Sequence, residues 1–238
     1  MLSTKIICTI GPASNSPKKL ADLAEAGMNI ARLNFSHGTH HSHKKIIEQI
    51  RKLNKDRQYP IAIMLDTQGP EIRTGDKVIT LISGKRVCVT IPPNEESEGT
   101  LFVNYVDLKD DLKEGSCISL DGGLMSLKVC GKNKKGLDCE VIDGGVVKAH
   151  RHVNLPGAIV KLPGITETDK RDILFGIEQK VDVIALSFVR SSETIREVRA
   201  SLGVHAQQIK LIAKIENQEG VERLEEIVQE ADGVMVAL

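Results

Sequence analysis

Short apolar runs recur in the first and last thirds of the chain, separated by stretches whose apolar residues fall at helical spacing. Such runs indicate strands buried on both faces of a parallel sheet. The sequence predicts these strands over residues 5–10, 28–33, 61–65, 181–188, 209–215 and 233–237. Helices are expected over residues 17–25 and 40–55, from Thr166 to about Gln179, after a Ser191 cap, and from Asn217 to about Gln229. This alternation of strand and helix predicts an α/β fold.

The segment from residue 70 to about residue 155 has a different pattern. Valine and isoleucine alternate with polar residues in short runs broken by glycine, proline and asparagine, which is typical of antiparallel strands. Strands are expected over residues 78–82, 86–90, 117–120, 125–129 and 137–141, with turns at 121–123 and 143–145. We therefore predict a strand–helix domain made of residues 1–69 and 156–238, split by an inserted β domain over residues 70–155.

Repeated strand–helix units fit either a closed eight-stranded barrel or an open doubly wound sheet. No glycine-rich dinucleotide fingerprint follows the first predicted strand, which favours the barrel. Six strands are too few to close one. The expected fold class is α/β, an incomplete TIM-type (β/α) barrel interrupted after strand 3 by a small all-β domain.

Composition narrows the class of function. The 32 basic and 32 acidic residues balance, so no long-range field favours nucleic acid or an anionic membrane as partner. No apolar run approaches the ~18 residues of a membrane span. The five cysteines are scattered and odd in number, and the first residues lack signal-peptide features. We expect a reduced, cytoplasmic protein.

Polar side chains follow several predicted strands at their carboxyl ends. Asp66 and Thr67 follow the strand 61–65, a turn at Gly69–Pro70 comes next, and Arg73 lies beyond it. Taken alone, this stretch would more often be a capped strand end with a surface arginine. The other strand ends carry Arg32, Asn34, Ser36 and His37, then Ser187 and Arg190, then Lys214 and Glu216. Since strand ends of a barrel share one rim, these groups are expected to form one site.

The chemistry of this set points to phosphate and hard cations. Its asparagine, serine, aspartate and threonine oxygens carry one negative charge, which suits a monovalent cation, and K⁺ is expected. Lys214 and Glu216 project to the same side of their strand, about 7 Å apart. A buried ion pair explains them equally well, but a carboxylate for Mg²⁺ beside lysine and arginine is what phosphoryl transfer requires.

Other polar clusters in the sequence have simpler explanations than a binding site. His40, His41 and His43 lack partners at metal-ligand spacing and are expected to be solvated. Residues 132–135 are expected to form a solvated charged hairpin. Residues 150–152 read equally well as a polar linker or, through Arg151, as a phosphate contact.

Taken together, these segments resemble the pyruvate kinase family. The resemblance runs nearly the full length and rests on residues 4–13 (TKIICTIGPA), 28–38 (MNIARLNFSHG), 65–75 (LDTQGPEIRTG), 153–157 (VNLPG) and 214–217 (KIEN). It implies a catalytic barrel with a small β lid domain inserted after strand 3, and phosphoryl transfer from phosphoenolpyruvate to ADP, giving ATP and pyruvate. Complete members are homo-tetramers.

The resemblance also implies roles for individual residues. Arg32 and Lys214 are the expected catalytic residues, and both bind substrate together with Ser187. The expected metal ligands are Asn34, Ser36, Asp66 and Thr67 for K⁺ and Glu216 for Mg²⁺. The expected nucleotide contacts are Asn34, Phe35, Ser36, His37, Arg73 and Arg151. Glu71 is typical of the K⁺-dependent members.

The chain departs from the family pattern in a few places. Gln68 and Arg151 stand where lysines are usual, and Asp121–Gly123 lacks the second of two lid aspartates. Family members continue past Ala237 with Arg-Gly-Asp, whereas this sequence has Leu238, so we expect a shortened chain without the second Mg²⁺ carboxylate. Two alternative functions remain open: a non-catalytic module that binds phosphate or K⁺, and a metal-dependent lyase or aldolase acting on pyruvate enolate.

Overall fold

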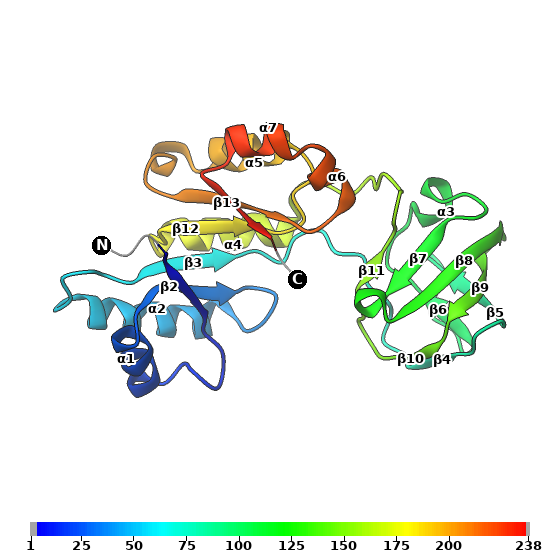
Figure 1. Ribbon diagram of the computed structural model, residues 1–238, viewed down its shortest axis with the longest axis horizontal. Helices are drawn as coiled ribbons and strands as arrows, with labels where there is room; N and C mark the ends of the chain where they lie inside the picture. The colour runs from blue at the N-terminus through cyan, green and yellow to red at the C-terminus, as the bar shows by residue number, and fades with distance from the viewer. Residues whose placement is uncertain (1–3, 237–238) are drawn as a thin grey trace. The chain divides into compact units, whose positions relative to one another are not determined.

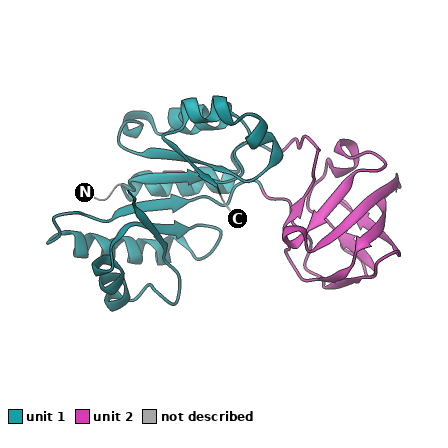
Figure 2. Ribbon diagram, viewed as in Figure 1, with its two compact units in different colours: residues 1–70, 163–238 teal, residues 71–162 magenta. Residues whose placement is uncertain are grey.

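A computed structural model describes residues 4–236, which form two compact units. Unit 1 comprises residues 1–70 and 163–238, and unit 2 comprises residues 71–162 (Figure 2). The two terminal segments outside the described residues include the predicted strand end at Ala237. In residues 4–236 the structure has no helix of the length and apolar character that a membrane crossing requires.

Unit 1 is built on a six-stranded sheet in which every pair of neighbours is parallel. Its order is β1 (Ile6–Thr9), β2 (Met28–Asn34), β3 (Ala62–Asp66), β12 (Val183–Leu186), β13 (Lys210–Ile215) and β14 (Gly233–Val236). The connections contain α1 (Pro17–Glu25), α2 (His40–Asn54), α4 (Glu167–Glu178), α5 (Ser192–Ser201), the short η2 (Gly203–His205), α6 (Gln218–Glu222) and α7 (Leu224–Glu230) (Figure 1). Strand order follows chain order, as in a barrel, and the predicted incomplete (β/α) barrel is confirmed.

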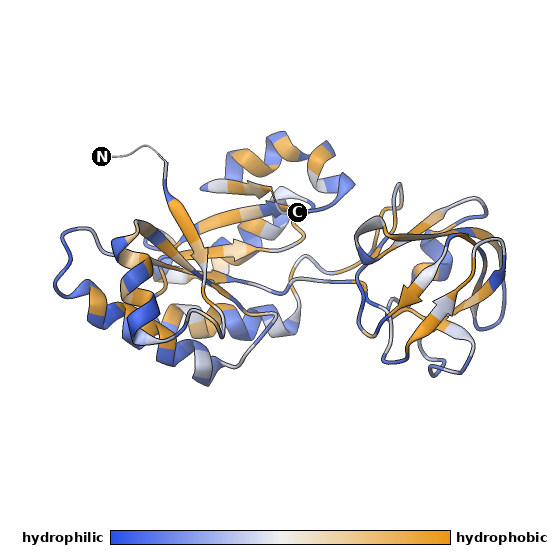
Figure 3. Ribbon diagram, turned by 60° about the horizontal axis from the view of Figure 1, so that its bottom comes forward, coloured by the Kyte–Doolittle hydropathy of each residue, from blue (hydrophilic) through white to orange (hydrophobic). Residues whose placement is uncertain are grey.

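The two faces of this sheet are buried differently. One face packs against the helices in a large cluster that includes Leu65, Ile184 and Ile50. The other face carries a small cluster of Met64, Val183 and Ala185 with no helix residue in it. Figure 3 shows the corresponding apolar strands and the mixed polarity of the covering helices. Strands buried on both sides therefore explain the continuous apolar runs in the sequence.

The first predicted strand is less buried than expected. Ile6 and Ile7 are 49% and 43% exposed, because β1 lies at the edge of the sheet and pairs only with β2. An apolar run cannot by itself distinguish a central strand from an edge strand. The prediction of a strand is confirmed, but the prediction that it is buried is wrong.

Side-chain caps begin most of the unit 1 helices. Ser16 accepts from the backbone of Lys19, and Thr39 and Thr166 each start a reciprocal capping box. The predicted cap of α5 at Ser191 is confirmed in position and is wrong only in that the side chain makes no capping hydrogen bond. The helix predicted from Asn217 to Gln229 is also wrong in part, since it breaks at Arg223 into α6 and α7.

Unit 2 is formed by short strands around an apolar core. Its strands are β4 (Ile79–Leu81), β5 (Arg86–Thr90), β6 (Thr100–Phe102), β7 (Cys117–Leu120), β8 (Met125–Lys132), β9 (Gly136–Asp143), β10 (Gly145–Val147) and β11 (Val153–Asn154), with a short α3 (Leu108–Asp111) and η1 (Asp121–Gly123). They make a six-stranded sheet, β11-β7-β8-β9-β5-β6, and a two-stranded one, β10-β4. All described pairings are antiparallel except β5–β6.

The second crossing between the units lies later in the chain than residue 155. Leu162 and Ala158 pack on the unit 2 core, and the backbone N–H of Lys161 donates to the Tyr105 hydroxyl at 2.7 Å. Tyr105 donates to Asp111, whose carboxylate also pairs with Lys161 at 2.9 Å. Burial and the Asp111 contact raise the pKa of Tyr105, which keeps the phenol protonated. These contacts hold residues 156–162 in unit 2.

Candidate active site

The carboxyl ends of four neighbouring strands meet at one edge of the unit 1 sheet. Asn34 at the end of β2 pairs in register with Asp66 at the end of β3, and Ala185 of β12 pairs with Asp66 from the other side. The next strand, β13, carries Lys214 close to its end. Parallel pairing therefore brings side chains from four chain segments to one place.

Asp66 is the centre of this arrangement and is 1% exposed. Its Oδ2 accepts from the Arg32 guanidinium, with Nε at 2.7 Å and Nη2 at 2.5 Å. Its Oδ1 lies 3.2 Å from the ammonium Nζ of Lys214, which is also buried. One carboxylate therefore orients two cations, and each is held by a charge-assisted hydrogen bond or ion pair.

Ser187 links the ends of β3 and β12. Its backbone N–H donates to Thr67 Oγ1 at 3.1 Å, and its hydroxyl donates to the Thr67 carbonyl at 2.7 Å. The same hydroxyl accepts from Lys214 Nζ at 2.8 Å. All three residues are buried, so Lys214 is held in one orientation by two polar partners from neighbouring strands.

Glu216 follows β13 and completes the cluster. Its Oε1 lies 3.3 Å from Lys214 Nζ, which bears out the expectation that the two project to one side. Its Oε2 accepts from the backbone N–H of Phe188 at 2.9 Å. Phe188 has φ 56°, a left-handed conformation that is costly for an aromatic residue, and it adopts this conformation where its N–H meets the carboxylate.

The turn after β3 requires glycine at position 69. Gly69 has φ 74°, and a Cβ there would lie 2.9 Å from both Cβ and O of Ser187. Its backbone N–H donates to the carboxylate of Asp169 at 2.9 Å, and Asp169 is buried. The close approach of this turn to Ser187 is therefore possible only without a side chain.

The loop between β2 and α2 lies beside Asp66. The Phe35 N–H donates to the Asp66 carbonyl at 2.9 Å, and the Ser36 N–H donates to Asn34 Oδ1 at 2.9 Å. The loop and the β3 exit together present amide, hydroxyl, carbonyl and carboxylate oxygens. These are the hard donors that an alkali or alkaline-earth cation prefers.

Rings from α2 and α4 pack behind this loop. Phe35 stacks on His43 with centroids 4.1 Å apart, and His40 stacks on Phe175 at 4.4 Å and pairs with Asp172 at 2.6 Å. Burial lowers the pKa of His43 and raises the pKa of Asp172. The prediction that all three histidines here are solvated is wrong for His43, which is 6% exposed and holds the His37 carbonyl.

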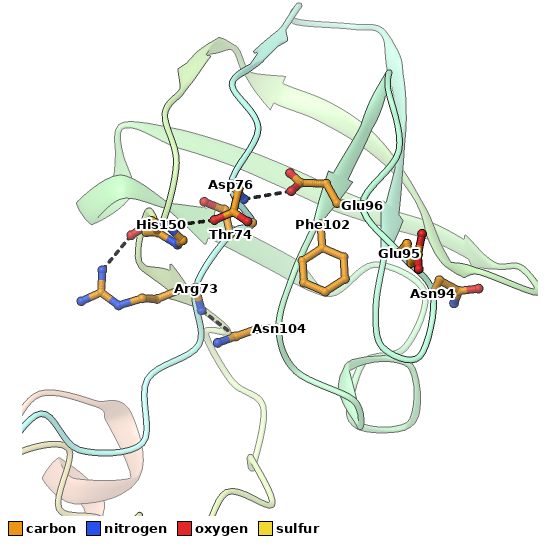
Figure 4. A pocket seen from close by; sticks show the side chains of 10 residues that line it. Arg73, Thr74, Asp76, Asn94, Glu95, Glu96, Phe102, Asn104 and His150 are labelled. Atoms are coloured by element: carbon orange, nitrogen blue, oxygen red, sulfur yellow. Dashed lines mark hydrogen bonds and ion pairs between the residues drawn. The ribbon is translucent and has the colours of Figure 1, made fainter. Parts of the chain in front are cut away.

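Two predicted nucleotide contacts, Arg73 and Arg151, belong to unit 2. Arg73 Nη1 donates to the His150 carbonyl at 2.7 Å, its Nε donates to Glu71, and it lines a cavity of about 450 Å³ (Figure 4). Arg151 lies 3.6 Å from Asp121. The segment 150–152 lies within unit 2, where the Arg151 N–H donates to Thr74 Oγ1 at 2.8 Å and His152 forms an isolated antiparallel bridge with Arg73.

The family model described as pyruvate kinase, barrel domain, matches residues 1–238. The chain belongs to the pyruvate kinase family. It is 46% identical to a pyruvate kinase of Sporosarcina psychrophila over the whole chain and 42% of that protein. It is 48% identical to a pyruvate kinase of Geobacillus stearothermophilus and 44% identical to plastidial pyruvate kinase 2 of Arabidopsis thaliana, in each case over 98% of this chain and 41% of the relative. The chain spans about two fifths of the length of these pyruvate kinases.

The structure brings together most of the unit 1 residues expected from the pyruvate kinase resemblance. Arg32, Lys214, Ser187 and Glu216 converge around Asp66 and Thr67. Asn34 ends β2 beside Asp66, and Phe35 and Ser36 lie on the adjoining loop. Arg190 instead donates to the Pro163 carbonyl and approaches Glu219 at 3.9 Å. The contacts establish proximity, and the roles of these residues stay predictions.

Sequence reasoning missed the residues that support this cluster from behind. Asp169 could be predicted as a helix cap, but its second contact, with Gly69, joins positions 100 residues apart. His43 carried one usable signal, since it falls on the same helical face as Ile46, Ile47 and Ile50, which are the apolar residues that α2 buries.

Proposed function

We propose that the protein transfers a phosphoryl group from phosphoenolpyruvate to ADP, producing ATP and pyruvate, with Mg²⁺ and K⁺ as cofactors. The observation that carries this proposal is the buried Lys214 ammonium, held by Asp66, Ser187 and Glu216 at the strand ends with Arg32 on the opposite oxygen of Asp66. Membership of the pyruvate kinase family supports the reaction class.

Lys214 and Arg32 supply the positive charge for the phosphate of the substrate. A guanidinium offers a planar fork to phosphate oxygens, and a lysine offers a compact charge that can follow the moving phosphoryl group. Both are held in place before substrate arrives, so little reorganisation opposes the transition state. Ser187, which accepts from Lys214, is proposed to keep the ammonium aimed while phosphate displaces its other contacts.

The donor set fits the two expected ions. K⁺ would be held by oxygens of Asn34, Ser36, Asp66 and Thr67, and Mg²⁺ by Glu216, where these ions supply positive charge that neutralises phosphate oxygens. Arg32 and Lys214 are formally balanced by Asp66 and Glu216, which is why extra cations favour phosphate binding. Among residues 4–236 no group of three or more histidine, cysteine or acidic side chains could hold a metal ion. Glu216 is the carboxylate of this chain that is proposed for Mg²⁺.

The nucleotide contacts are proposed from Asn34 to His37 in unit 1 and from Arg73 and Arg151 in unit 2, which would serve as the lid. Unit 2 supplies guanidinium groups that are partly exposed, with side-chain exposures of 33% and 38%, and so remain open to a phosphate. A cytoplasmic location and a homo-tetrameric assembly are proposed with the activity, as the family resemblance implies.

A coupled assay for ATP formation from phosphoenolpyruvate and ADP tests the proposal. The chain is assayed by itself and as a chimera joined to the remaining residues of the Geobacillus stearothermophilus relative, with Mg²⁺ and with K⁺ or Li⁺. We expect ADP-dependent turnover by the chimera that K⁺ stimulates. Lys214→Met should lower kcat at least about 100-fold, the effect of removing one preorganised charge donor.

Lys210→Met is the matched control, because Lys210 begins the same strand but is exposed and pairs with Asp232. It should retain kcat within about twofold. Turnover of phosphoenolpyruvate without ADP would instead indicate a lyase. Binding of a phosphoenolpyruvate analogue with no turnover in either form would indicate a binding module.

A further inference from the structure

His43 on α2 contacts the loop between β2 and α2, which carries part of the proposed ion site, on both sides of Ser36. Its ring stacks on Phe35 with centroids 4.1 Å apart and planes 14° from parallel. Its Nε2 lies 2.9 Å from the carbonyl oxygen of His37. One buried side chain therefore holds the residue before Ser36 and the residue after it.

The hydrogen bond fixes the protonation of this imidazole. A carbonyl only accepts, so Nε2 must carry the proton and donate it to the His37 oxygen. Within residues 4–236 the other nitrogen, Nδ1, is buried and has no hydrogen-bond partner. Burial lowers the pKa of His43, in agreement with a neutral ring.

A purely packing role does not call for a histidine at this position. A phenylalanine would stack on Phe35 equally well. It would also avoid the buried nitrogen without a hydrogen-bond partner, which costs free energy in the histidine. What the imidazole adds is the Nε2–H donor toward the loop. The feature that distinguishes His43 from an apolar residue is therefore the one that reaches His37.

The surroundings keep His43 and the loop in register. Phe35 lies 5.8 Å from Phe175 on α4, and Phe175 stacks on His40, which pairs with Asp172. Gly38 has φ 80°, and a Cβ there would lie 3.2 Å from His43 Nε2. The loop therefore approaches α2 closely and is supported by a ring cluster that joins α2 to α4.

We propose that His43 is a positioning residue for the monovalent-cation site, holding the backbone around Ser36 so that the Asn34 and Ser36 oxygens stay beside Asp66 and Thr67. This inference rests on the proposed function, because it assigns His43 to the K⁺ site named there. His43 itself does not contact the ion or the substrate.

Three substitutions separate the donor from the ring. His43→Phe keeps the stacking and removes the donor, His43→Gln keeps a nitrogen donor at similar reach without the ring, and His43→Asn carries an amide too short to reach His37. His41→Phe is the matched control, because His41 is the exposed histidine two residues earlier. Each variant is made in the chain and in the chimera.

Two constants are measured: the K⁺ concentration that gives half-maximal activity, and the dissociation constant for Tl⁺, which is determined by thallium NMR. Loss of one hydrogen bond that shapes the site should raise both constants about five- to tenfold in His43→Phe and His43→Asn. His43→Gln should restore them to within about twofold of wild type, and His41→Phe should leave them unchanged. At saturating K⁺ the kcat should return, a separation that general destabilisation would not produce.

If His43→Phe does not fold, the Gln and Asn variants decide the question by the same comparison. Unchanged ion constants in the folded donor-less variants would overturn the positioning role while leaving the ion site in place. Absence of Tl⁺ and K⁺ binding by wild-type protein would overturn the ion site and the positioning role together, so the two failures are distinguishable.

Discussion

The two units use charged residues in opposite ways. Unit 1 gathers buried charges at the ends of its strands, where Asp66 is 1% and Lys214 7% exposed. Unit 2 fills its interior with apolar side chains such as Leu127 and Val129. The carboxylate of Asp111, with a side chain that is 3% exposed, is paired with Tyr105 and Lys161. The side chains of Arg73 and Arg151, the proposed nucleotide contacts in unit 2, are partly exposed.

The contrast indicates that the two units of this pyruvate kinase family member are suited to different kinds of contact. Buried charges in a low-dielectric setting interact strongly and must be matched, so the unit 1 site is rigid and sensitive to single changes. Ion pairs of partly exposed arginines are screened by water and contribute little to stability. Unit 2 is therefore suited to contacts that form and break, while its stability comes from its apolar core.

The largest expected effect is that of Asp66→Asn in unit 1. Loss of the carboxylate leaves the Arg32 and Lys214 charges without their shared partner, and should lower the free energy of unfolding of unit 1 by about 3–5 kcal/mol. The free energy of unfolding of each unit is measured by hydrogen exchange at increasing urea concentrations. Asp76→Asn, at an 83% exposed side chain of unit 2, should change stability by less than about 0.5 kcal/mol. Equal effects of the two substitutions would remove the contrast.

A change in the apolar core should have the next largest effect and should be confined to unit 2. Leu127 is fully buried, so Leu127→Ala should lower the free energy of unfolding of unit 2 by about 2–5 kcal/mol through lost contacts and a cavity. Leu124→Ala, at a residue 73% exposed, is the control and should be nearly neutral. Hydrogen exchange in β2, β3 and β13 should not change. Faster exchange there would show that the units share their stability.

Among the three test substitutions, Arg151→Met should have the smallest effect on stability. Its contact with Asp121 is long and partly exposed, so its loss should change stability by less than about 1 kcal/mol. As a proposed nucleotide contact, it should still raise the KM for ADP about three- to tenfold with kcat retained. Steady-state kinetics of the chimera measure this, with Lys134→Met on the exposed hairpin as control. A KM that does not change would exclude Arg151 from the nucleotide site.

Much of the fold could be predicted from local pattern. Strands buried on both faces give continuous apolar runs, and caps such as Thr166 mark helix starts, so the order of elements was accessible without coordinates. The alternation of Lys214 and Glu216 predicted their common side, and parallel topology predicted that strand ends would meet. Unit 2 was harder, since the three residues of β6 and of β10 are too short to carry a periodic signal.

The parts that could not be predicted depend on tertiary contacts, which leave no mark on the local sequence pattern. Nothing in the local sequence of Asp169 indicates that it holds Gly69, and nothing near His43 indicates that it meets a carbonyl of the preceding loop. The exposure of β1 depends on its place at the sheet edge, and the packing of residues 156–162 depends on Tyr105. Periodicity reports the face of an element, and not which partner lies opposite.

Because one carboxylate holds both Arg32 and Lys214, the two cations are not independent of each other in mutational terms. A stepwise route that replaces Asp66, Arg32 and Lys214 passes through forms in which a charged side chain of this cluster has lost a partner. Strong epistasis among these three positions follows, and directed evolution of this site will progress by paired exchanges more readily than by single ones.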